Sequence, residues 1–199
     1  MLLQRRRADL GRSVVNLGYS PHYGWYQEEL RKELRVPDGG VILIVEDNEV
    51  DLLRIQRAFS KAKVLNPLFT VRTGEEAIEY LKGVGQYASR NEYPLPELVL
   101  LDLKLIGING FQVLKWIREQ PGLRGLRVVV LTGSTAVDDI NLAYQLGANS
   151  FLVKPMDFES FVQIAGAVAG YWVWMSKSPE TTRAEEGPQH TPKNSERTA

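Results

Sequence analysis

The sequence predicts an α/β fold, in which a doubly wound parallel sheet of five strands carries helices on both faces. Two observations lead to this prediction. Five short apolar runs, rich in β-branched residues, have the composition of strands buried on both faces of a sheet. The segments between them have apolar residues at helical spacing, and strands that alternate with helices build βα units with right-handed crossovers.

The first two strands are predicted at 41–45, a continuous apolar run, and at 68–72, where apolar and polar residues alternate. Asn48 is suited to cap the helix that follows the first strand. Thr73 opens the next helix, because Thr73 and Glu76 have the spacing of a capping box. A loop rich in glycine, proline and tyrosine then leads to the third strand.

The third strand is predicted at 98–103 and carries one acidic residue, Asp102, among apolar neighbours. A helix over 111–120 follows and ends at Pro121, because proline cannot continue a helix. The fourth strand is predicted at 127–132, where the residues are again mostly apolar and β-branched.

In the last part of the body, Thr135 is expected to cap a helix that ends at Gly147. The fifth strand is predicted at 150–153. Asp157 opens the final helix, which we extend to about residue 177. The body therefore consists of five βα units.

The composition excludes several kinds of chemistry. The 199 residues contain no cysteine and two histidines, His22 and His190, which lie near the ends of the chain. Disulfides, thiolate metal sites, cysteine nucleophiles and histidine catalysis are therefore not expected. Basic and acidic residues number 24 each, so a strong attraction to nucleic acid or anionic lipid is not expected either.

No segment has the features of a membrane span or a secretory signal. The longest apolar stretch, 164–175, is shorter than the roughly 20 residues that a helix needs to cross a bilayer. The arginines at 5–7 are not followed by the apolar stretch of a signal peptide. We therefore expect a cytoplasmic protein without a membrane partner.

Composition divides the chain into three regions. Residues 1–40 are polar and aromatic without a clear period, and they are interpreted as an extension that is an arm or disordered. The alternative interpretation is that translation truly starts downstream of Met1, so that this extension does not belong to the protein. Residues 41–177 form the predicted domain. Residues 178–199 contain no large apolar side chain and are expected to be a disordered tail.

Polar side chains occur where the predicted strands end. They are Glu46 and Asp47 after the first strand, Asp102 in the third, Thr132 in the fourth and Lys154 after the fifth. Because the carboxyl ends of parallel strands meet at one edge, these side chains are expected to lie together. Three carboxylates form an oxygen-rich site suited to Mg²⁺. The simpler alternative is that Glu46 and Asp47 cap a helix and Asp102 only pairs with a lysine.

With these motifs in place, residues 41–177 resemble the receiver domain of two-component response regulators. The matching segments are Ile44-Val-Glu-Asp-Asn48, Leu100-Leu-Asp-Leu103, Gly110, Leu131-Thr-Gly133 and Leu152-Val-Lys-Pro155. Residues 93–96 and 147–150 are similar to stand-alone receivers found with phytochrome-type and hybrid histidine kinases. The resemblance implies a flavodoxin-like (βα)5 fold with strand order 2-1-3-4-5.

By this resemblance, Asp102 would be the phosphoacceptor, taking a phosphoryl group from a histidine kinase or a histidine phosphotransfer protein. Mg²⁺ would be held by Glu46, Asp47, Asp102 and the backbone carbonyl of Lys104. The family usually has proline four residues after the acceptor, where this chain has Ile106. The missing proline implies a more mobile loop after Asp102, but no metal ligand is lost.

The resemblance also assigns roles at the fourth and fifth strands. Lys154 would neutralise charge on the transferred group, and the Thr132 hydroxyl would donate to a phosphoryl oxygen. Phe151 would be the aromatic residue that turns inward when Thr132 moves. The Lys154–Pro155 peptide bond would be cis.

Three other functions have different requirements. A phosphatase of the haloacid-dehalogenase type needs a second acid two residues after its nucleophilic aspartate, where this chain has Lys104. A flavin-binding flavodoxin needs a hydroxyl-rich phosphate loop where this chain has Glu46 and Asp47, which would repel the phosphate. A receiver-like binding or scaffold module that acts without phosphorylation stays open. We therefore expect a single-domain signalling protein and not an enzyme.

The signal is expected to pass by protein–protein contact, since no DNA-binding or catalytic output module is recognisable. The final helix carries a core-facing stripe, which consists of Phe158, Phe161, Val162, Ala165, Val168 and Trp172. Residues 171–175 are apolar nearly all round and need a cover. We expect a phosphorylation-linked homodimer through the fourth helix, fifth strand and fifth helix. The amino-terminal arm and a kinase surface are the alternative covers.

Overall fold

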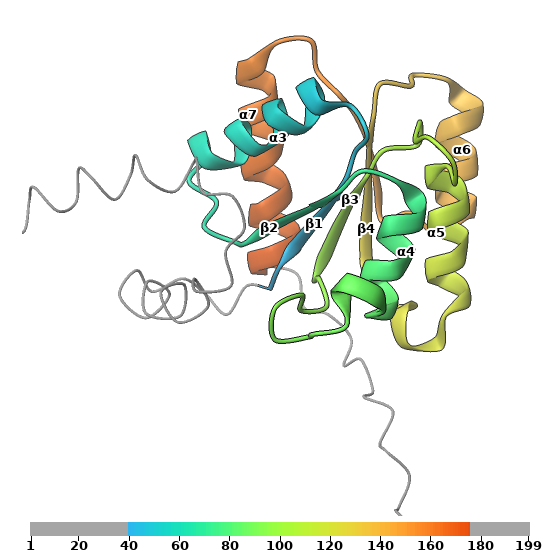
Figure 1. Ribbon diagram of the computed structural model, residues 1–199. Helices are drawn as coiled ribbons and strands as arrows, with labels where there is room; N and C mark the ends of the chain where they lie inside the picture. Colours follow the sequence, from blue (N-terminus) through green and yellow to red (C-terminus); the bar gives the residue numbers. More distant parts are fainter. Residues whose placement is uncertain (1–39, 176–199) are drawn as a thin grey trace, which may run out of the picture.

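The computed structural model describes residues 40–175, without the side chains of Trp174 and Met175. Its five parallel strands form one sheet in the order β2-β1-β3-β4-β5, which confirms the predicted fold class (Figure 1). The strands are β1 (Ile42–Val45), β2 (Leu68–Val71), β3 (Leu98–Leu101), β4 (Arg127–Thr132) and β5 (Ser150–Val153). The expectations for the amino-terminal extension and the carboxy-terminal tail lie outside the described residues.

Helices cover both faces of the sheet (Figure 1). Helices α3 (Glu49–Lys61) and α7 (Phe158–Val168) lie on one face, and α4 (Gly74–Lys82), α5 (Gly110–Glu119) and α6 (Val137–Gln145) lie on the other. Two short 3₁₀ helices, η2 (Gly85–Tyr87) and η3 (Pro121–Leu123), lie in the connections. A π-helix, η4 (Ala169–Met175), continues α7. No helix within residues 40–175 has both the length and the apolar character that crossing a membrane requires.

The core consists of two main layers because successive strand residues point to opposite faces of the sheet. In β1, Leu43 and Val45 belong to the cluster under α4 and α5, whereas Ile42 and Ile44 belong to the cluster under α3 and α7. All residues of β1, β3 and β4 are buried. This burial on both faces explains why these strands are continuous apolar runs rather than alternating ones.

Side-chain caps begin several helices where the sequence places them. Asn48 accepts a hydrogen bond from the Asp51 amide (3.0 Å), and Asp157 accepts one from the Ser160 amide (2.8 Å). Both caps are as predicted. The extension of the last helix is confirmed as far as Met175, although its last seven residues are π-helical.

The capping box expected at Thr73 is only half formed. Thr73 accepts from the Glu76 amide (3.1 Å), but the Glu76 carboxylate accepts from the Arg72 amide (2.7 Å) instead of the cap's own amide. The reciprocal box is found at the start of α5, between Asn109 and Gln112. Which side chain turns back depends on the backbone path before the helix, which sequence spacing does not define.

The prediction that Thr135 caps the fourth helix is wrong. Helix α6 begins at Val137, and its cap residue, Ala136, has no side-chain hydrogen bond. The neighbouring hydroxyl of Ser134 serves the turn instead: it accepts from the Ala136 amide (3.3 Å) and donates to Asp139 (2.5 Å). The loop after β4 is therefore one residue longer than expected.

Candidate functional site

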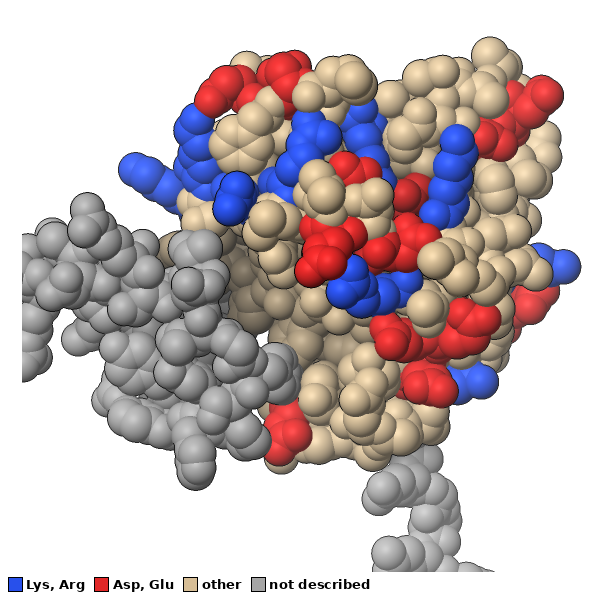
Figure 2. Space-filling view, turned by 45° about the horizontal axis from the view of Figure 1, so that its top comes forward, with Lys and Arg blue, Asp and Glu red and all other residues tan. Residues whose placement is uncertain are grey.

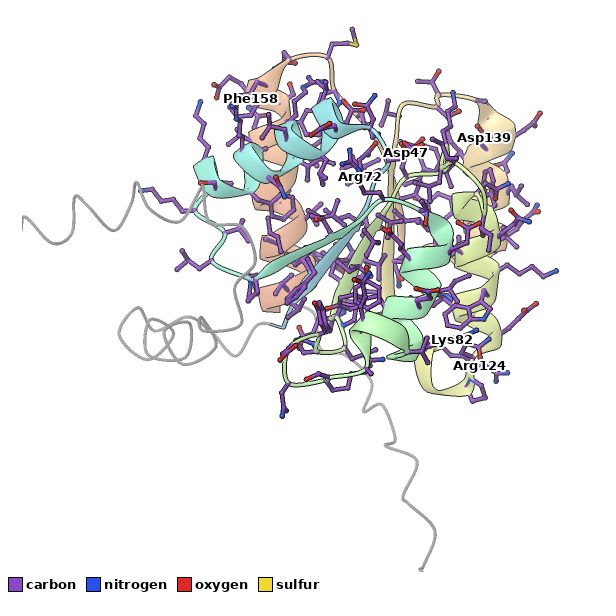
Figure 3. The ribbon with its side chains drawn as sticks, viewed as in Figure 1. Asp47, Arg72, Lys82, Arg124, Asp139 and Phe158 are labelled. Carbon is purple, nitrogen blue, oxygen red and sulfur yellow. The ribbon has the colours of Figure 1, made fainter. Side chains whose placement is uncertain are left out.

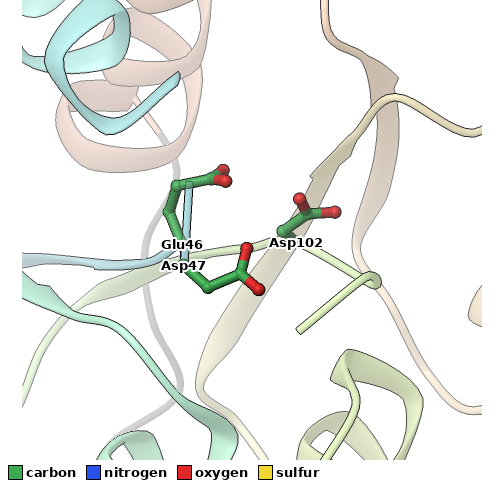
Figure 4. Close-up of side chains that lie close together, drawn as sticks. All are labelled: Glu46, Asp47 and Asp102. Atoms are coloured by element: carbon green, nitrogen blue, oxygen red, sulfur yellow. The ribbon is translucent and has the colours of Figure 1, made fainter. Parts of the chain in front are cut away.

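The sheet register brings the predicted acids together. Val45 is paired with Leu101, and the Asp102 amide donates to the Val45 carbonyl (3.0 Å), so the residues that follow β1 and β3 lie side by side. Oxygen atoms of Glu46, Asp47 and Asp102 lie within 4.8 Å of one another (Figure 4). In Figure 3, Asp47 lies at the end of the sheet opposite to Lys82 and Arg124. This is the end at which strands β1, β3 and β4 finish.

Two of the three acids are buried and need a cation nearby. Glu46 is 1% exposed and Asp102 is 7% exposed, whereas Asp47 is half-buried. The Lys154 ammonium lies 2.6 Å from Glu46 Oε2 and 2.6 Å from Asp102 Oδ2. It also lies 3.0 Å from Asp51 Oδ2. The three protons of the ammonium therefore have three carboxylates within reach.

Burial and the ion pairs between Lys154 and the acids shift the pKa values of these groups in opposite directions. Burial raises the pKa of Glu46 to about 7, although Lys154 opposes this rise. Burial also raises the pKa of Asp102, but the hydrogen bond and charge of Lys154, together with the nearby Thr132 hydroxyl, outweigh it and lower the pKa below its usual value. Burial would lower the pKa of Lys154, yet Asp102 and Glu46 raise it. Asp102 is thus ionised beside a charged lysine, as a carboxylate nucleophile requires.

The loop after Asp102 is tied back to the acids by backbone amides. Asp102 Oδ1 accepts from the Lys104 amide (3.2 Å), and Asp47 Oδ2 accepts from the Ile106 amide (3.2 Å). A proline in place of Ile106 could not make the second bond. A Cβ at Gly110 would lie 2.1 Å from the Asp102 carbonyl oxygen, so a glycine is needed where α5 passes Asp102. The backbone carbonyl of Lys104 as a metal ligand stays a prediction.

Thr132 and Phe151 lie in the neighbouring strands. Thr132 is fully buried, and its hydroxyl oxygen makes no hydrogen bond of good geometry within residues 40–175, although it is close enough to lower the pKa of Asp102. Phe151 is half-buried against a small cluster that includes Leu103 and Ala143. The implied cis bond before Pro155 is not found, because every peptide bond in the described residues is trans.

The acids fit a divalent cation. Carboxylate oxygens are the ligands that Mg²⁺ and Mn²⁺ prefer, and half-buried Asp47 leaves this group of three open to solvent. Figure 2 shows acidic side chains gathered at this end of the molecule, with lysine and arginine side chains beside them. A cation bound here would also favour the ionised form of Glu46.

Sequence reasoning missed two residues at this edge, Asp51 and Arg54. Asp51 looks like an acid placed in the first turn of a helix to complement its dipole, and Arg54 looks like its partner one turn later. No local signal links either residue to the fifth strand. The structure places both beside Lys154 and the loop that follows it.

Comparison with known proteins gives a consistent result. The family model of the response regulator receiver domain matches residues 42–165. The probable methanogenesis regulatory protein FilR2 of Methanothrix harundinacea is 37% identical over 146 residues, which cover 73% of this chain and 92% of FilR2. Response regulator Rcp1 of Synechocystis is 32% identical over 133 residues, which cover 67% of this chain and 88% of Rcp1.

Solved structures of receivers superpose on the same region. The phosphorylated cyanobacterial phytochrome response regulator RcpA matches with a TM-score of 0.65 and 35% identity, over 71% of this chain and 98% of RcpA. The Mn²⁺-bound form of Rcp1 matches with a TM-score of 0.63 and 32% identity, over 70% of this chain and 98% of Rcp1. A relative of similar fold therefore carries a divalent cation.

Proposed function

The chain belongs to the response regulator receiver family, close to the phytochrome response regulators, and we propose that it accepts a phosphoryl group on Asp102. Members of this family are signalling proteins and not enzymes, and receiver domains bind a divalent metal ion. The observation that carries the proposal is the contact between Asp102 and Lys154, a buried ionised carboxylate 2.6 Å from a buried ammonium. The relatives match over most of their own length, which supports a stand-alone regulator.

The proposed reaction uses the residues at the strand ends. A carboxylate oxygen of Asp102 attacks the phosphorus of a phosphohistidine. A phosphorus–oxygen bond forms, the phosphorus–nitrogen bond breaks, and the imidazole leaves with the electron pair and takes up a proton from water. Lys154 lies where charge builds on the transferred group, and the Thr132 hydroxyl is available to donate to a phosphoryl oxygen.

Mg²⁺ is the proposed cofactor of this step. Glu46, Asp47 and Asp102 would hold it, with the backbone carbonyl of Lys104. Bound Mg²⁺ supplies positive charge that offsets the repulsion between an anionic nucleophile and an anionic phosphoryl group. The support is the grouping of three carboxylates and the Mn²⁺ bound by Rcp1.

The proposed donor is a histidine kinase or a histidine phosphotransfer protein. Large apolar side chains are exposed in the segments that follow β1, β3 and β5, at the end of the sheet where the acids lie. They are Val50, Leu53, Ile106 and Met156. Apolar side chains around a charged centre are typical of a protein-docking surface. A nucleic-acid or membrane partner is not part of the proposal, and the proposed location is the cytoplasm.

The proposed output is a homodimer formed through α6, β5 and α7. Four large apolar side chains are exposed on α6 and β5; they are Val137, Leu142, Tyr144 and Val153. Phe151 lies in β5, so a change around Thr132 would reach this face. Tyr171 in η4 is also exposed, whereas Trp172 and Ile164 are partly buried against the core.

Phosphorylation is tested with acetyl phosphate and Mg²⁺. We expect the wild-type protein to gain one phosphoryl group by intact mass, and Asp102→Asn to gain none. A variant of an acid outside the site, Glu119→Gln, should behave like the wild type. Full phosphorylation of Asp102→Asn would contradict the assignment, and a wild-type protein that takes up no phosphoryl group would favour the phosphorylation-independent binding module.

The dimer is tested by sedimentation with and without beryllofluoride, which stands in for the phosphoryl group. We expect beryllofluoride to shift the wild type toward a dimer, and Leu142→Glu in α6 to prevent the shift. Leu53→Glu carries the same change on α3, which is not part of the proposed α6–β5–α7 face, and should still dimerise. A wild-type monomer under both conditions would contradict the dimer.

A further inference from the structure

Asp51 is a third carboxylate on Lys154 that the proposed chemistry does not use. Its Oδ2 atom lies 3.0 Å from the Lys154 ammonium, yet Asp51 is not one of the three acids whose oxygens lie within 4.8 Å of one another. It comes from the first turn of α3, 103 residues before Lys154. Its side chain is 25% exposed, so most of it is shielded from water.

Asp51 is itself held from two sides. Its amide donates to the Asn48 side chain (3.0 Å), which fixes the start of α3. Its other carboxylate oxygen, Oδ1, lies 3.6 Å from the Arg54 guanidinium. The Asp51 carboxylate therefore bridges Lys154, which follows β5, and Arg54, which lies one turn further along α3.

Arg54 is fixed in turn by the segment that follows Lys154. Its guanidinium donates to the carbonyls of Pro155 (3.1 Å) and Met156 (2.8 Å), and it lies over the Phe161 ring of α7 at 4.7 Å from the centroid. A planar guanidinium bound to two carbonyls and an aromatic ring has little freedom. Lys154, Asp51, Arg54 and the 155–156 backbone thus form a closed set of contacts between α3 and the β5–α7 loop.

We propose that Asp51 is a positioning residue for phosphoryl transfer, which keeps the Lys154 ammonium beside Asp102, with Arg54 as its brace. This inference rests on the proposed function. During the reaction Asp102 becomes an acyl phosphate, and Glu46 is a proposed metal ligand, so both contacts of Lys154 change. The Asp51 contact is the one that the reaction leaves unchanged. A lysine on a flexible four-carbon chain needs such an anchor to act as a fixed charge.

The rate test uses acetyl phosphate and Mg²⁺. A carboxylate oxygen of Asp102 forms a bond to phosphorus, the bond between phosphorus and the acetyl oxygen breaks, and acetate leaves with the electron pair. In Asp51→Asn the maximum rate at saturating acetyl phosphate is expected to fall by about 3- to 10-fold, because Lys154 loses its place. The half-saturating concentration should not rise, since removing a negative charge does not weaken the attraction of an anionic donor.

Two matched variants separate positioning from a general loss of charge. Asp51→Glu keeps a carboxylate in reach and should recover part of the maximum rate. Glu49→Gln removes an exposed acid from the same turn of α3. The Glu49 carboxylate lies 3.7 Å from the Arg72 guanidinium and is not paired with Lys154, so this variant should leave the rate unchanged. An Asp51→Asn variant with the wild-type rate, or an equal fall in Glu49→Gln, would overturn the proposal.

A second measurement does not need phosphorylation. Exchange of the Lys154 ammonium protons with water, followed by ¹⁵N NMR, should be faster in Asp51→Asn than in the wild type and in Glu49→Gln. Unchanged exchange in Asp51→Asn would overturn the positioning role. A wild-type protein that takes up no phosphoryl group would contradict the proposed function alone, because the exchange rates still decide about Asp51. If Asp51→Asn fails to fold, Arg54→Lys replaces it, with the same expected faster exchange.

Discussion

The charge balance of the site depends on one side chain, that of Lys154. It is 8% exposed and lies between two buried carboxylates, Glu46 and Asp102. Removing one partner of a buried ion pair leaves the other charge uncompensated, which commonly costs about 3–5 kcal/mol. The same lysine is thus important for the fold as well as for the proposed transfer.

In Lys154→Ala we expect the free energy of unfolding to fall by about 3–5 kcal/mol without metal, because two buried carboxylates then repel each other. Mg²⁺ should restore part of the loss, since a cation at the acids replaces the lost charge. Urea denaturation with and without Mg²⁺ measures both effects. Lys115→Ala, which removes an exposed lysine 3.9 Å from Glu119, is the control and should change little. Equal stability of the two variants would contradict this account.

Gly110 is needed because α5 begins against the backbone of Asp102. Its added Cβ would lie 2.1 Å from the Asp102 carbonyl oxygen, a backbone atom that cannot move aside alone. In Gly110→Ala we expect the free energy of unfolding to fall by about 1–3 kcal/mol, together with a slower reaction with acetyl phosphate. Gly122→Ala is the control, because its Cβ would meet no atom within 4 Å. A Gly110→Ala variant as stable as Gly122→Ala would show that the loop can shift freely.

Among the helices within residues 40–175, α5 has the most completely capped start. Asn109 accepts from the Gln112 amide (3.0 Å), and the Gln112 side chain accepts from the Asn109 amide (3.1 Å). This helix follows the loop that carries Lys104 and Ile106, so its cap also limits how far that loop can move.

Asn109→Ala removes the half of this box in which the Asn109 side chain accepts from the Gln112 amide, and it should lower the free energy of unfolding by about 1 kcal/mol. Chemical denaturation measures the change. Thr135→Ala is the matched control: Thr135 precedes a helix as Asn109 does, but it is not the cap residue of α6. If Thr135→Ala were the more damaging of the two, the assignment of the caps in the structure would be wrong.

At the level of the whole domain, the proposed metal site connects β1 with β3. A cation that binds only the folded protein stabilises it by about 2.7 kcal/mol at 100 times its dissociation constant. We expect Mg²⁺ to raise the melting temperature of the wild-type protein and to lose this effect in Asp47→Asn. Glu119→Gln should keep the full shift. If Mg²⁺ still raised the melting temperature of Asp47→Asn by the full amount, the metal would have to bind at a place other than this group of acids.

The strands were predictable because their signals are local. Residues 127–132 were predicted as a strand with its true bounds, since a β-branched run buried on both faces has a composition that other elements lack. The acids were predictable as a group because parallel strands end at a common edge, which makes Asp102 a neighbour of Glu46 by topology alone.

The helix caps were only partly predictable. Asn48 and Asp157 cap their helices as expected, but the hydroxyl that serves the start of α6 belongs to Ser134 and not to Thr135. Several capping residues in a row are chemically equivalent. The backbone path out of β4 decides between them, and that path depends on packing around the loop.

The sequence by itself determined the fold class, the strand order through family resemblance, and the residues that end the strands, because these follow from local composition and from the geometry of parallel sheets. Only the tertiary structure decided that Asp51 reaches Lys154 and that Arg54 binds the carbonyls after it. Those contacts join residues about 100 positions apart, through the packing of α3 against α7. Periodicity places a residue on a face of its own helix, but the side chain that it meets there is set by how the helices pack.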